Sequence, residues 1–189
     1  ALLRYAQAQN VYIIEDDYDS EFRYTGTPVA PIYAMDAQRT IYVGTFSKTV
    51  FPALRIGFAI LPKALHLRSC DLGTHYHVQN HPFPMAALAE FLGTRRLDRH
   101  IRRMRGLYGK RRQALLGALT QSFGAGWTAC GDAAGLHVAI EFPGMRFGET
   151  FSRRCAEEGI FVTPLEAHCI EKGRHEGALV LGYGHLEIG

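Results

Sequence analysis

Two stretches of this 189-residue sequence end in side chains that could do covalent chemistry. "VYIIEDDYD" begins at residue 11 and ends in acids and a tyrosine, and "TIYVGTFSK" begins at residue 40 and ends in hydroxyls and a lysine, with an arginine seven residues beyond that lysine. The candidate side chains are Asp16, Tyr18, Thr45, Ser47, Lys48 and Arg55. No acid stands close to the lysine in its own stretch, which leaves its amine available for a reaction.

This set of groups matches the needs of pyridoxal 5'-phosphate. A lysine amine condenses with the cofactor aldehyde, and an acid keeps the pyridine nitrogen protonated so that the ring withdraws electrons. Hydroxyl groups and an arginine bind the phosphate. Each residue has an ordinary structural interpretation when taken singly, since acids often end strands and Ser47 suits a turn. The combination in this order favours the cofactor.

Three predicted strands must position these groups. Residues 11–17, 40–46 and 54–61 are short β-branched and aromatic runs, which is typical of buried strands in an α/β sheet. Ligands of open parallel sheets bind outside the carboxyl ends of the strands. We therefore expect the ends of the first two strands to lie at the same edge of one sheet.

The remaining sequence predicts a second, smaller portion. Residues 81–93 predict a helix that ends at Gly93, and an apolar stripe with helical spacing from Leu97 to Leu119 predicts one long helix. Short helix and strand candidates follow at 135–142, 147–158, 160–163 and 178–183. We place a boundary near residue 100, so that 1–100 form part of an α/β domain and 101–189 a small, incomplete α+β domain.

Three motifs resemble those of a known family: "IIEDDYDSEFRY", "IYVGTFSKTVFPALRIGF" and "DRHIRRMRGLYGKRRQALLGAL". They are similar to the aminotransferase-like domain of MocR/GabR-type regulators of the GntR family, which join a winged helix-turn-helix to a fold-type I domain that uses pyridoxal phosphate. The resemblance implies the second half of the large, mainly parallel-sheet domain plus the small C-terminal domain. It makes Lys48 the Schiff-base lysine, Asp16 the partner of the pyridine nitrogen and Tyr18 the donor to the phenolate oxygen. The resemblance implies that Thr45, Ser47 and Arg55 bind the phosphate.

The resemblance also implies a function. The chain would sense an amine or amino acid that forms an external aldimine, within a cytoplasmic homodimer that binds DNA through an N-terminal domain absent from this sequence. The alternative is an enzyme, a 2-aminoadipate-type aminotransferase, in which Lys48 also moves a proton. Tyr18 follows Asp16 by two residues, as in the regulators, whereas aminotransferases with "DDPY" place the tyrosine one position later.

The residue that would hold a ligand carboxylate departs from the family pattern. General aminotransferases use an arginine in the last strand, where this sequence has Val180, and the best-known regulators have an arginine where Glu176 stands. Arg174 is the nearby arginine, and we take it as the candidate, against the alternative of an ordinary solvated side chain.

Other features favour ordinary structure over function. Nine cations lie between Arg95 and Arg112 against one acid, Asp98, which indicates a solvated helix face, with nucleic-acid binding as the alternative. Four cysteines without paired spacing predict reduced thiols, and the histidines at 75, 77 and 81 predict a loop and no metal site. Arg55 interrupts the most apolar stretch, so we expect no membrane span.

Overall fold

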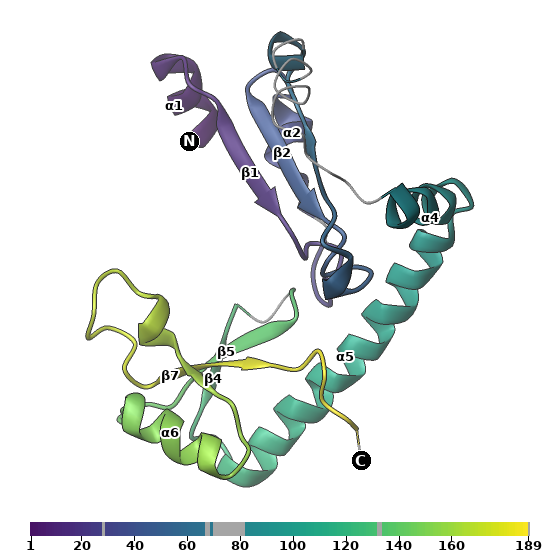
Figure 1. Ribbon diagram of the computed structural model, residues 1–189. Helices are drawn as coiled ribbons and strands as arrows, with labels where there is room; N and C mark the ends of the chain where they lie inside the picture. Colours follow the sequence, from purple (N-terminus) through teal and green to yellow (C-terminus); the bar gives the residue numbers. More distant parts are fainter. Residues whose placement is uncertain (28, 67–68, 70–81, 132–133, 189) are drawn as a thin grey trace. The chain divides into compact units, whose positions relative to one another are not determined.

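The structure is a computed structural model that describes residues 1–27, 29–66, 69, 82–131 and 134–188 (Figure 1). It divides into two compact units. Unit 1 consists of Ala1–Ser20 and Thr27–Arg102, and unit 2 consists of Glu21–Gly26 and Arg103–Gly189.

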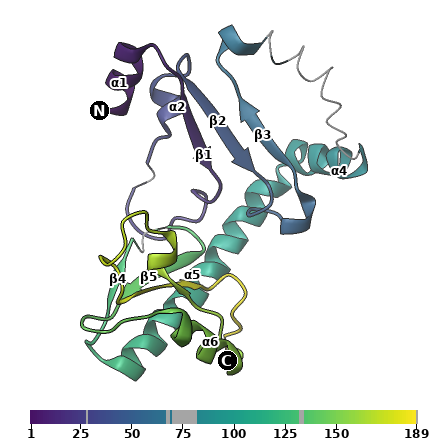
Figure 2. The same ribbon diagram turned by 60° about the vertical axis from the view of Figure 1, so that its left-hand side comes forward.

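Unit 1 contains a three-stranded sheet of β1 (Ile13–Asp17), β2 (Thr40–Thr45) and β3 (Gly57–Ile60), in that spatial order (Figure 2). β1 and β2 are parallel, and β2 and β3 are antiparallel. The helices are α1 (Leu2–Gln9), α2 (Ile32–Met35) and α4 (Pro82–Gly93), with a 3-10 turn, η1 (Pro52–Leu54), before β3. The predicted strands at 11–17 and 40–46 and the predicted helix at 81–93 are confirmed.

The strand register assigns the residues of the sheet to two faces. Glu15 pairs with Tyr42, Asp17 pairs with Gly44, and Gly44 pairs with Phe58, so these side chains share one face. The Glu15 carboxylate accepts hydrogen bonds from the backbone N–H groups of Ile32 and Tyr33, at 2.8 and 2.9 Å, and so fixes the first turn of α2. A Cβ at Gly44 would lie 2.4 Å from the Phe58 ring, which explains the glycine in the middle of the sheet.

The prediction that all three strands are buried is wrong for β3. All four β3 residues are exposed, and Ile14 of β1 is 70% exposed. The β1 and β2 residues are mostly half-buried. The apolar runs form strands as expected, but β3 stands at an edge of this three-stranded sheet, and all four of its residues, which alternate between the two faces, are exposed.

Unit 2 packs one helix and a four-stranded antiparallel sheet around the main core. The sheet order is β4 (Thr128–Cys130), β5 (His137–Glu141), β7 (Ala178–Gly182), β6 (Thr163–Pro164). α5 (Arg96–Phe123), most of which belongs to unit 2, contributes its predicted apolar stripe, and α6 (Glu149–Glu157) and the 3-10 turn η2 (Leu165–His168) complete the unit. The buried core residues are Leu119, Val138, Ile140, Phe142, Phe147, Leu179 and Tyr183.

The segment Glu21–Gly26 follows β1 in the sequence but belongs to unit 2. Phe22 is fully buried, and its ring meets that of Tyr108 edge to face, with the centroids 5.0 Å apart. The hydroxyls of Tyr24 and Tyr183 both donate to the carbonyl of Gly135, at 2.9 and 2.7 Å. Burial raises the pKa of Tyr24, and its interaction with Tyr183 raises it further.

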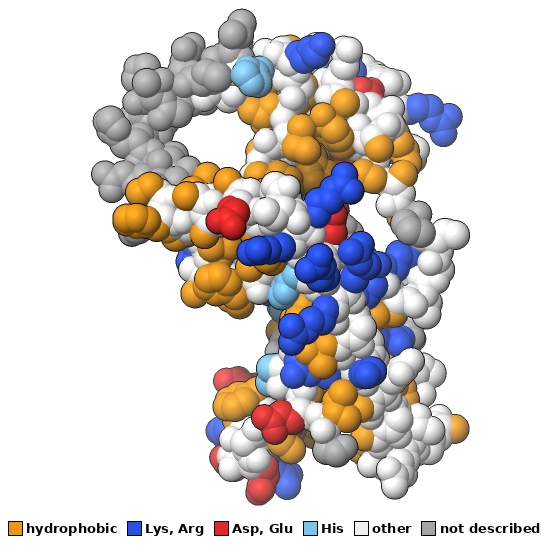
Figure 3. Space-filling model, turned by 90° about the vertical axis from the view of Figure 1, so that its right-hand side faces the viewer, with side chains coloured by type: hydrophobic (Ala, Val, Ile, Leu, Met, Phe, Trp, Pro, Cys, Tyr) orange, Lys and Arg blue, Asp and Glu red, His pale blue; other side chains and the backbone are white. Residues whose placement is uncertain are grey.

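Three arginines of α5 correct the interpretation of the basic stretch as a solvated face. Arg105 Nε donates to the Glu21 carbonyl at 2.7 Å, and Arg111 donates to the Gly184 carbonyl. Arg112 is 8% exposed, with its guanidinium 5.8 Å from the centre of the Tyr24 ring. These cations hold chain segments against the helix within unit 2. Other cations on α5 are exposed as predicted, and Figure 3 shows lysine and arginine side chains gathered along it.

Candidate functional site

The candidate residues of unit 1 meet at one edge of its sheet. β1 and β2 are parallel and end at Asp17 and Thr45, and the antiparallel β3 begins at Gly57, which pairs with Thr45. Side chains just after β1, just after β2 and just before β3 therefore lie at the same edge. We call this region the carboxyl edge, formed by Asp16, Tyr18, Thr45, Ser47, Lys48 and Arg55.

The acids near this edge differ in what they bind. Asp17 accepts hydrogen bonds from the Tyr42 hydroxyl at 2.7 Å and from the Ser20 hydroxyl at 2.6 Å, and Glu15 holds α2. Asp16 points to the opposite face, since side chains alternate along a strand, and it is exposed. Asp16 has no hydrogen-bond or ion-pair partner among the described residues. Two acids thus have structural bonds, and Asp16 is available to a ligand.

A hydrogen-bonded loop carries Lys48. The Thr45 hydroxyl accepts from the Ser47 backbone N–H at 3.1 Å and donates to the Ile56 carbonyl at 3.4 Å. Phe46 N–H donates to the Ile56 carbonyl at 2.9 Å, and Val50 N–H donates to the Phe46 carbonyl at 2.8 Å. Lys48 is exposed between these bonds, and within the described chain no acid pairs with it. The loop fixes the lysine backbone and leaves its amine free.

Arg55 has an unusual backbone conformation. It follows η1 with φ 50° and ψ 35°, in the left-handed region, where a residue with a side chain costs about 1 kcal/mol or more relative to glycine. The side chain is exposed, and the described residues offer it no acidic partner. Strained backbone of this kind gathers at ligand-binding sites, because function retains it against its cost.

Four aromatic side chains beside the carboxyl edge were missed from the sequence. The rings of Phe46 and Phe58 have centroids 5.3 Å apart, and the Tyr42 ring lies 6.2 Å from those of Phe58 and Tyr33. Tyr42, Gly44 and Phe46 alternate along the chain, so their period of two places them on one face. That alternation is the sequence signal that could have found the cluster.

The carboxyl edge fits the groups that pyridoxal phosphate requires. It offers a primary amine, a carboxylate and a phenol that have no partner among the described residues, together with hydroxyl groups and a guanidinium for a phosphate. All of these belong to unit 1 and lie at the ends of β1 and β2 or in the loop between β2 and β3. The donor set therefore suits an anionic aldehyde.

Arg174 lies in unit 2, in the loop between η2 and β7. It is 74% exposed and forms an ion pair with Glu171, with an N–O distance of 3.0 Å. Glu176 pairs with Arg146 at 3.1 Å, and Val180 lies within β7, paired with Ala139 and Thr163. Both charged residues of this loop are thus in exposed ion pairs, Glu176 with Arg146 and Arg174 with Glu171.

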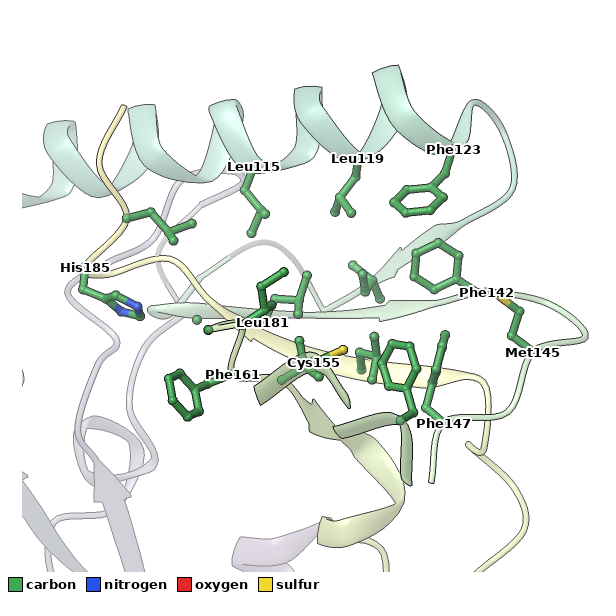
Figure 4. A pocket seen from close by; sticks show the side chains of 18 residues that line it. Leu115, Leu119, Phe123, Phe142, Met145, Phe147, Cys155, Phe161, Leu181 and His185 are labelled. Carbon is green, nitrogen blue, oxygen red and sulfur yellow. The ribbon is translucent and has the colours of Figure 1, made fainter. Parts of the chain in front are cut away.

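Unit 2 also contains a cavity of about 620 Å³ (Figure 4). Leu119 and Phe123 of α5 point into it from one side, and Phe142 and Phe147 point into it from the other. Cys155 and His185 supply the polar side-chain atoms of its lining, and no charged acid, lysine or arginine contributes to the lining. The cavity suits an apolar occupant and lacks the groups that an anionic cofactor needs.

The described part of the chain shows neither a membrane-spanning helix nor a metal cluster. None of its helices has the length and apolar character needed to cross a bilayer. Among the same residues, no group of three or more histidine, cysteine or acidic side chains lies together as a metal site would require. The histidines at 75, 77 and 81 fall outside the described residues.

The chain is similar in sequence to known transcription regulators. No protein-family model matches the chain. The chain is 34% identical to the uncharacterized HTH-type transcriptional regulator YhdI of Bacillus subtilis, over 98% of the chain and 39% of that protein. It is 35% identical to the probable rhizopine catabolism regulatory protein MocR of Rhizobium meliloti, over 98% of the chain and 38% of that protein.

Solved structures of aminotransferases match the fold of the chain. The crystal structure of the multiple substrate aminotransferase of Thermococcus profundus matches 98% of the chain and 46% of that protein, with a TM-score of 0.84 and 27% identity. The expected fold class, that of the fold-type I pyridoxal phosphate-dependent transferases, is confirmed. The chain spans less than half the length of the proteins that it matches. It belongs with the aminotransferase-like domains of the MocR-type transcription regulators.

Proposed function

We propose that this chain is the ligand-sensing domain of a bacterial transcription regulator and that it binds pyridoxal 5'-phosphate at the carboxyl edge. The proposal rests on one observation: some polar groups there already have hydrogen-bond partners within the fold, and others have none among the described residues. Asp17, Glu15 and Tyr42 form structural hydrogen bonds, whereas Asp16, Tyr18, Lys48 and Arg55 have no partner among the described residues. Polar groups that the fold leaves unused at a strand edge are available to a ligand.

Each residue has a distinct part in the proposal. Pyridoxal phosphate, when bound, supplies an aldehyde that reacts with primary amines and a ring that withdraws electrons. Lys48 offers its Nζ to that aldehyde, and Asp16 holds a proton at the pyridine nitrogen. Tyr18 donates a hydrogen bond to the phenolate oxygen. Thr45, Ser47 and Arg55 bind the phosphate, for which the guanidinium is the strongest donor.

The regulator is favoured over an enzyme because the curated relatives that match 98% of the chain include regulators. In the proposal, DNA is bound by a winged helix-turn-helix in another part of the full-length protein, and the signal is an amine or amino acid that displaces Lys48. The full-length protein forms a homodimer. The second candidate, an amino-acid aminotransferase, is favoured by the structural match to a multiple substrate aminotransferase. In that case Lys48 also carries a proton between substrate and cofactor.

Spectral titration separates these functions. The full-length protein is loaded with pyridoxal phosphate and titrated with a panel of amines and amino acids, and both visible absorbance and release of a 2-oxo acid are measured. We expect a saturable spectral change without continued formation of 2-oxo acid in the unmodified protein and in Lys63→Ala, a matched exposed lysine. Lys48→Ala abolishes the change.

Two outcomes would contradict the proposal. A spectral response that survives in Lys48→Ala overturns the assignment of the carboxyl edge. Continued 2-oxo acid formation with an added acceptor, lost in Lys48→Ala, favours the aminotransferase over the regulator.

A further inference from the structure

α5 carries two groups of cations that differ in what they contact. Arg105, Arg111 and Arg112 contact groups within unit 2. Five other cations of the helix are exposed, and Figure 3 shows basic side chains gathered along it: Arg96, Arg99, Arg102, Arg103 and Lys110. Among the described residues, Arg96 has an ion pair with Glu90 at 3.9 Å, and the other four have no acidic partner. The fold therefore leaves most of these charges without a counter-charge from the described chain.

Four of the exposed cations share one face of the helix, and we call them the basic stripe: Arg96, Arg99, Arg103 and Lys110. Successive members are three, four and seven residues apart, which places them within about 60° around the axis at about 100° per residue. α5 is one unbroken helix, so helix geometry alone sets their spacing. The stripe is about 21 Å long at about 1.5 Å per residue. Asp98, the only acid of α5, lies outside this face.

Gly106 lies on the same face, between Arg103 and Lys110. Glycine inside a helix destabilises it relative to alanine, and a Cβ at this position would meet no atom of the described residues within 4 Å. Contacts within the described chain thus give no reason for a glycine here. The missing side chain leaves room for a bulky partner to approach the backbone of α5 between two cations.

We propose that the basic stripe binds the sugar–phosphate backbone of double-stranded DNA. Like charges on one helix face repel one another, so a partner with repeated negative charges relieves the repulsion. Each DNA strand carries one phosphate per about 3.4 Å of axis, so a stripe of about 21 Å faces about six phosphates of one strand. Every cation of the stripe can therefore have a phosphate of its own. Contacts to phosphates add affinity without selecting a sequence.

The inference goes beyond the proposed function, in which DNA is bound by a winged helix-turn-helix in another part of the full-length protein. It rests on that function in one respect: the relatives are transcription regulators, and DNA is therefore the polyanion to which we assign the stripe. The aminotransferase-like domain thus adds a contact to DNA that does not depend on the base sequence.

The salt dependence of DNA binding tests the inference. Full-length protein is titrated into a fluorescent DNA duplex of mixed sequence at a series of NaCl concentrations, and anisotropy gives the binding constant. In the stripe variant, Arg99→Gln/Arg103→Gln/Lys110→Gln, the slope of log K against log[NaCl] should become less steep by about 2–3, at about 0.9 per lost phosphate contact. Glutamine has a helix propensity close to that of lysine and arginine. An unchanged absorbance of bound pyridoxal phosphate shows that the variant is folded.

The matched control is Lys63→Gln/Arg153→Gln/Arg154→Gln, which removes the same charge from exposed cations outside α5. Its slope should stay unchanged. Equal changes of slope in the two variants would overturn the inference, because net charge alone would explain them. DNA binding with an unchanged slope in the stripe variant would also overturn it, and would leave the proposed function standing.

Two further results would count against the stripe as a DNA contact. Full-length protein that binds no DNA would overturn both the inference and the DNA-binding part of the proposed function. Binding of poly-L-glutamate that is lost in the stripe variant, beside DNA binding that is kept, would assign the stripe to an acidic protein partner instead.

Discussion

The carboxyl edge of unit 1 and the cavity of unit 2 differ in almost every property. The edge carries an exposed amine, acid, phenol and guanidinium without partners in the described chain. The cavity has about 620 Å³ of space, but its lining is apolar apart from Cys155 and His185. A hollow becomes a probable reaction site only when polar groups converge on it. In this protein the polar groups without partners in the described chain lie at the carboxyl edge and not in this cavity.

The two units also differ in how far their apolar side chains are buried. Ile140 and Tyr183 belong to a buried hydrophobic core, and each side chain is 1% exposed. The strands of unit 1 have Ile14 and all of β3 exposed. Stability should therefore depend on unit 2, and ligand binding on unit 1.

The largest expected effect is on the stability of unit 2. Ile140→Ala removes a side chain that is 1% exposed and should cost about 2–5 kcal/mol of unfolding free energy. Ile14→Ala, the matched change at a side chain 70% exposed, should cost less than about 0.5 kcal/mol. Urea unfolding followed by circular dichroism, with Trp127 fluorescence reporting on unit 2, measures both. Similar costs for the two variants would remove the contrast between the regions.

The next largest effect is expected at Arg55, where a substitution should weaken cofactor binding without lowering the stability of the protein. Arg55→Gly relieves the backbone conformation at φ 50° and removes the proposed phosphate ligand. Loss of charge-assisted hydrogen bonds worth about 1.5–3 kcal/mol should weaken cofactor binding by about ten- to a hundred-fold. Stability should stay unchanged or rise by up to about 1 kcal/mol.

Arg95→Gly is the matched control for Arg55→Gly, because Arg95 is an exposed arginine of unit 1 with φ 54°. It should gain stability in the same way without loss of cofactor affinity. Fluorescence titration of the full-length apoprotein with pyridoxal phosphate measures the binding. Equal losses of affinity in the two variants would mean that Arg55 acts only through its positive charge and not through hydrogen bonds to the phosphate.

Two tyrosines at the sheet should respond differently to loss of their hydroxyls. Tyr42→Phe removes the hydrogen bond to Asp17 and should cost about 1 kcal/mol of stability. Tyr18→Phe should leave stability unchanged and alter the visible spectrum of the bound cofactor. Thermal unfolding and absorbance measure the two effects. A stability loss in Tyr18→Phe with an unchanged spectrum would indicate a structural role for Tyr18.

The smallest effect concerns the Glu166 loop. Hydrogen bonds from the backbone of Gly173 and His175 hold the pKa of Glu166 below its ordinary value of 4.5. A lowered pKa means that the loop is fully stabilised above pH 4.5 and loses this support only as the pH falls through the lower, folded-state pKa. Amide exchange at Gly173 and His175 should therefore stay slow at pH 4.5. Loss of protection already at pH 5 would contradict the lowered pKa.

Most elements could be predicted because local sequence determines them. The apolar runs at 11–17 and 40–46 form β1 and β2, and the apolar stripe through Leu115 and Leu119 forms α5. α2 was missed because it has four residues and its first turn is held by Glu15, seventeen residues away. β4 was missed because it lies between glycine-rich turns. The return of Glu21–Gly26 to unit 2 depends on tertiary contacts of Phe22 that no local pattern shows.

The candidate site shows the same limit. Spacing brought the lysine, the hydroxyls and the acids together, but it could not choose between Asp16 and Asp17, and the choice came from a family resemblance. The structure supplies a physical difference, since Asp17 binds Tyr42 and Ser20 while Asp16 lies on the other face. The aromatic cluster and the hydrogen bonds from Gly173 and His175 to Glu166 depend on tertiary contacts. Spacing along the sequence does not show such contacts.

The central claim is that the carboxyl edge binds the cofactor through Lys48, and borohydride trapping tests it most directly. The full-length protein is incubated with pyridoxal phosphate, reduced, digested and mapped by mass spectrometry, beside Lys48→Ala and Lys63→Ala. We predict a stable phosphopyridoxyl adduct on Lys48 in the unmodified protein and in Lys63→Ala, and no specific adduct in Lys48→Ala. Equal labelling of Lys48→Ala, or an adduct concentrated on another lysine, would contradict the claim.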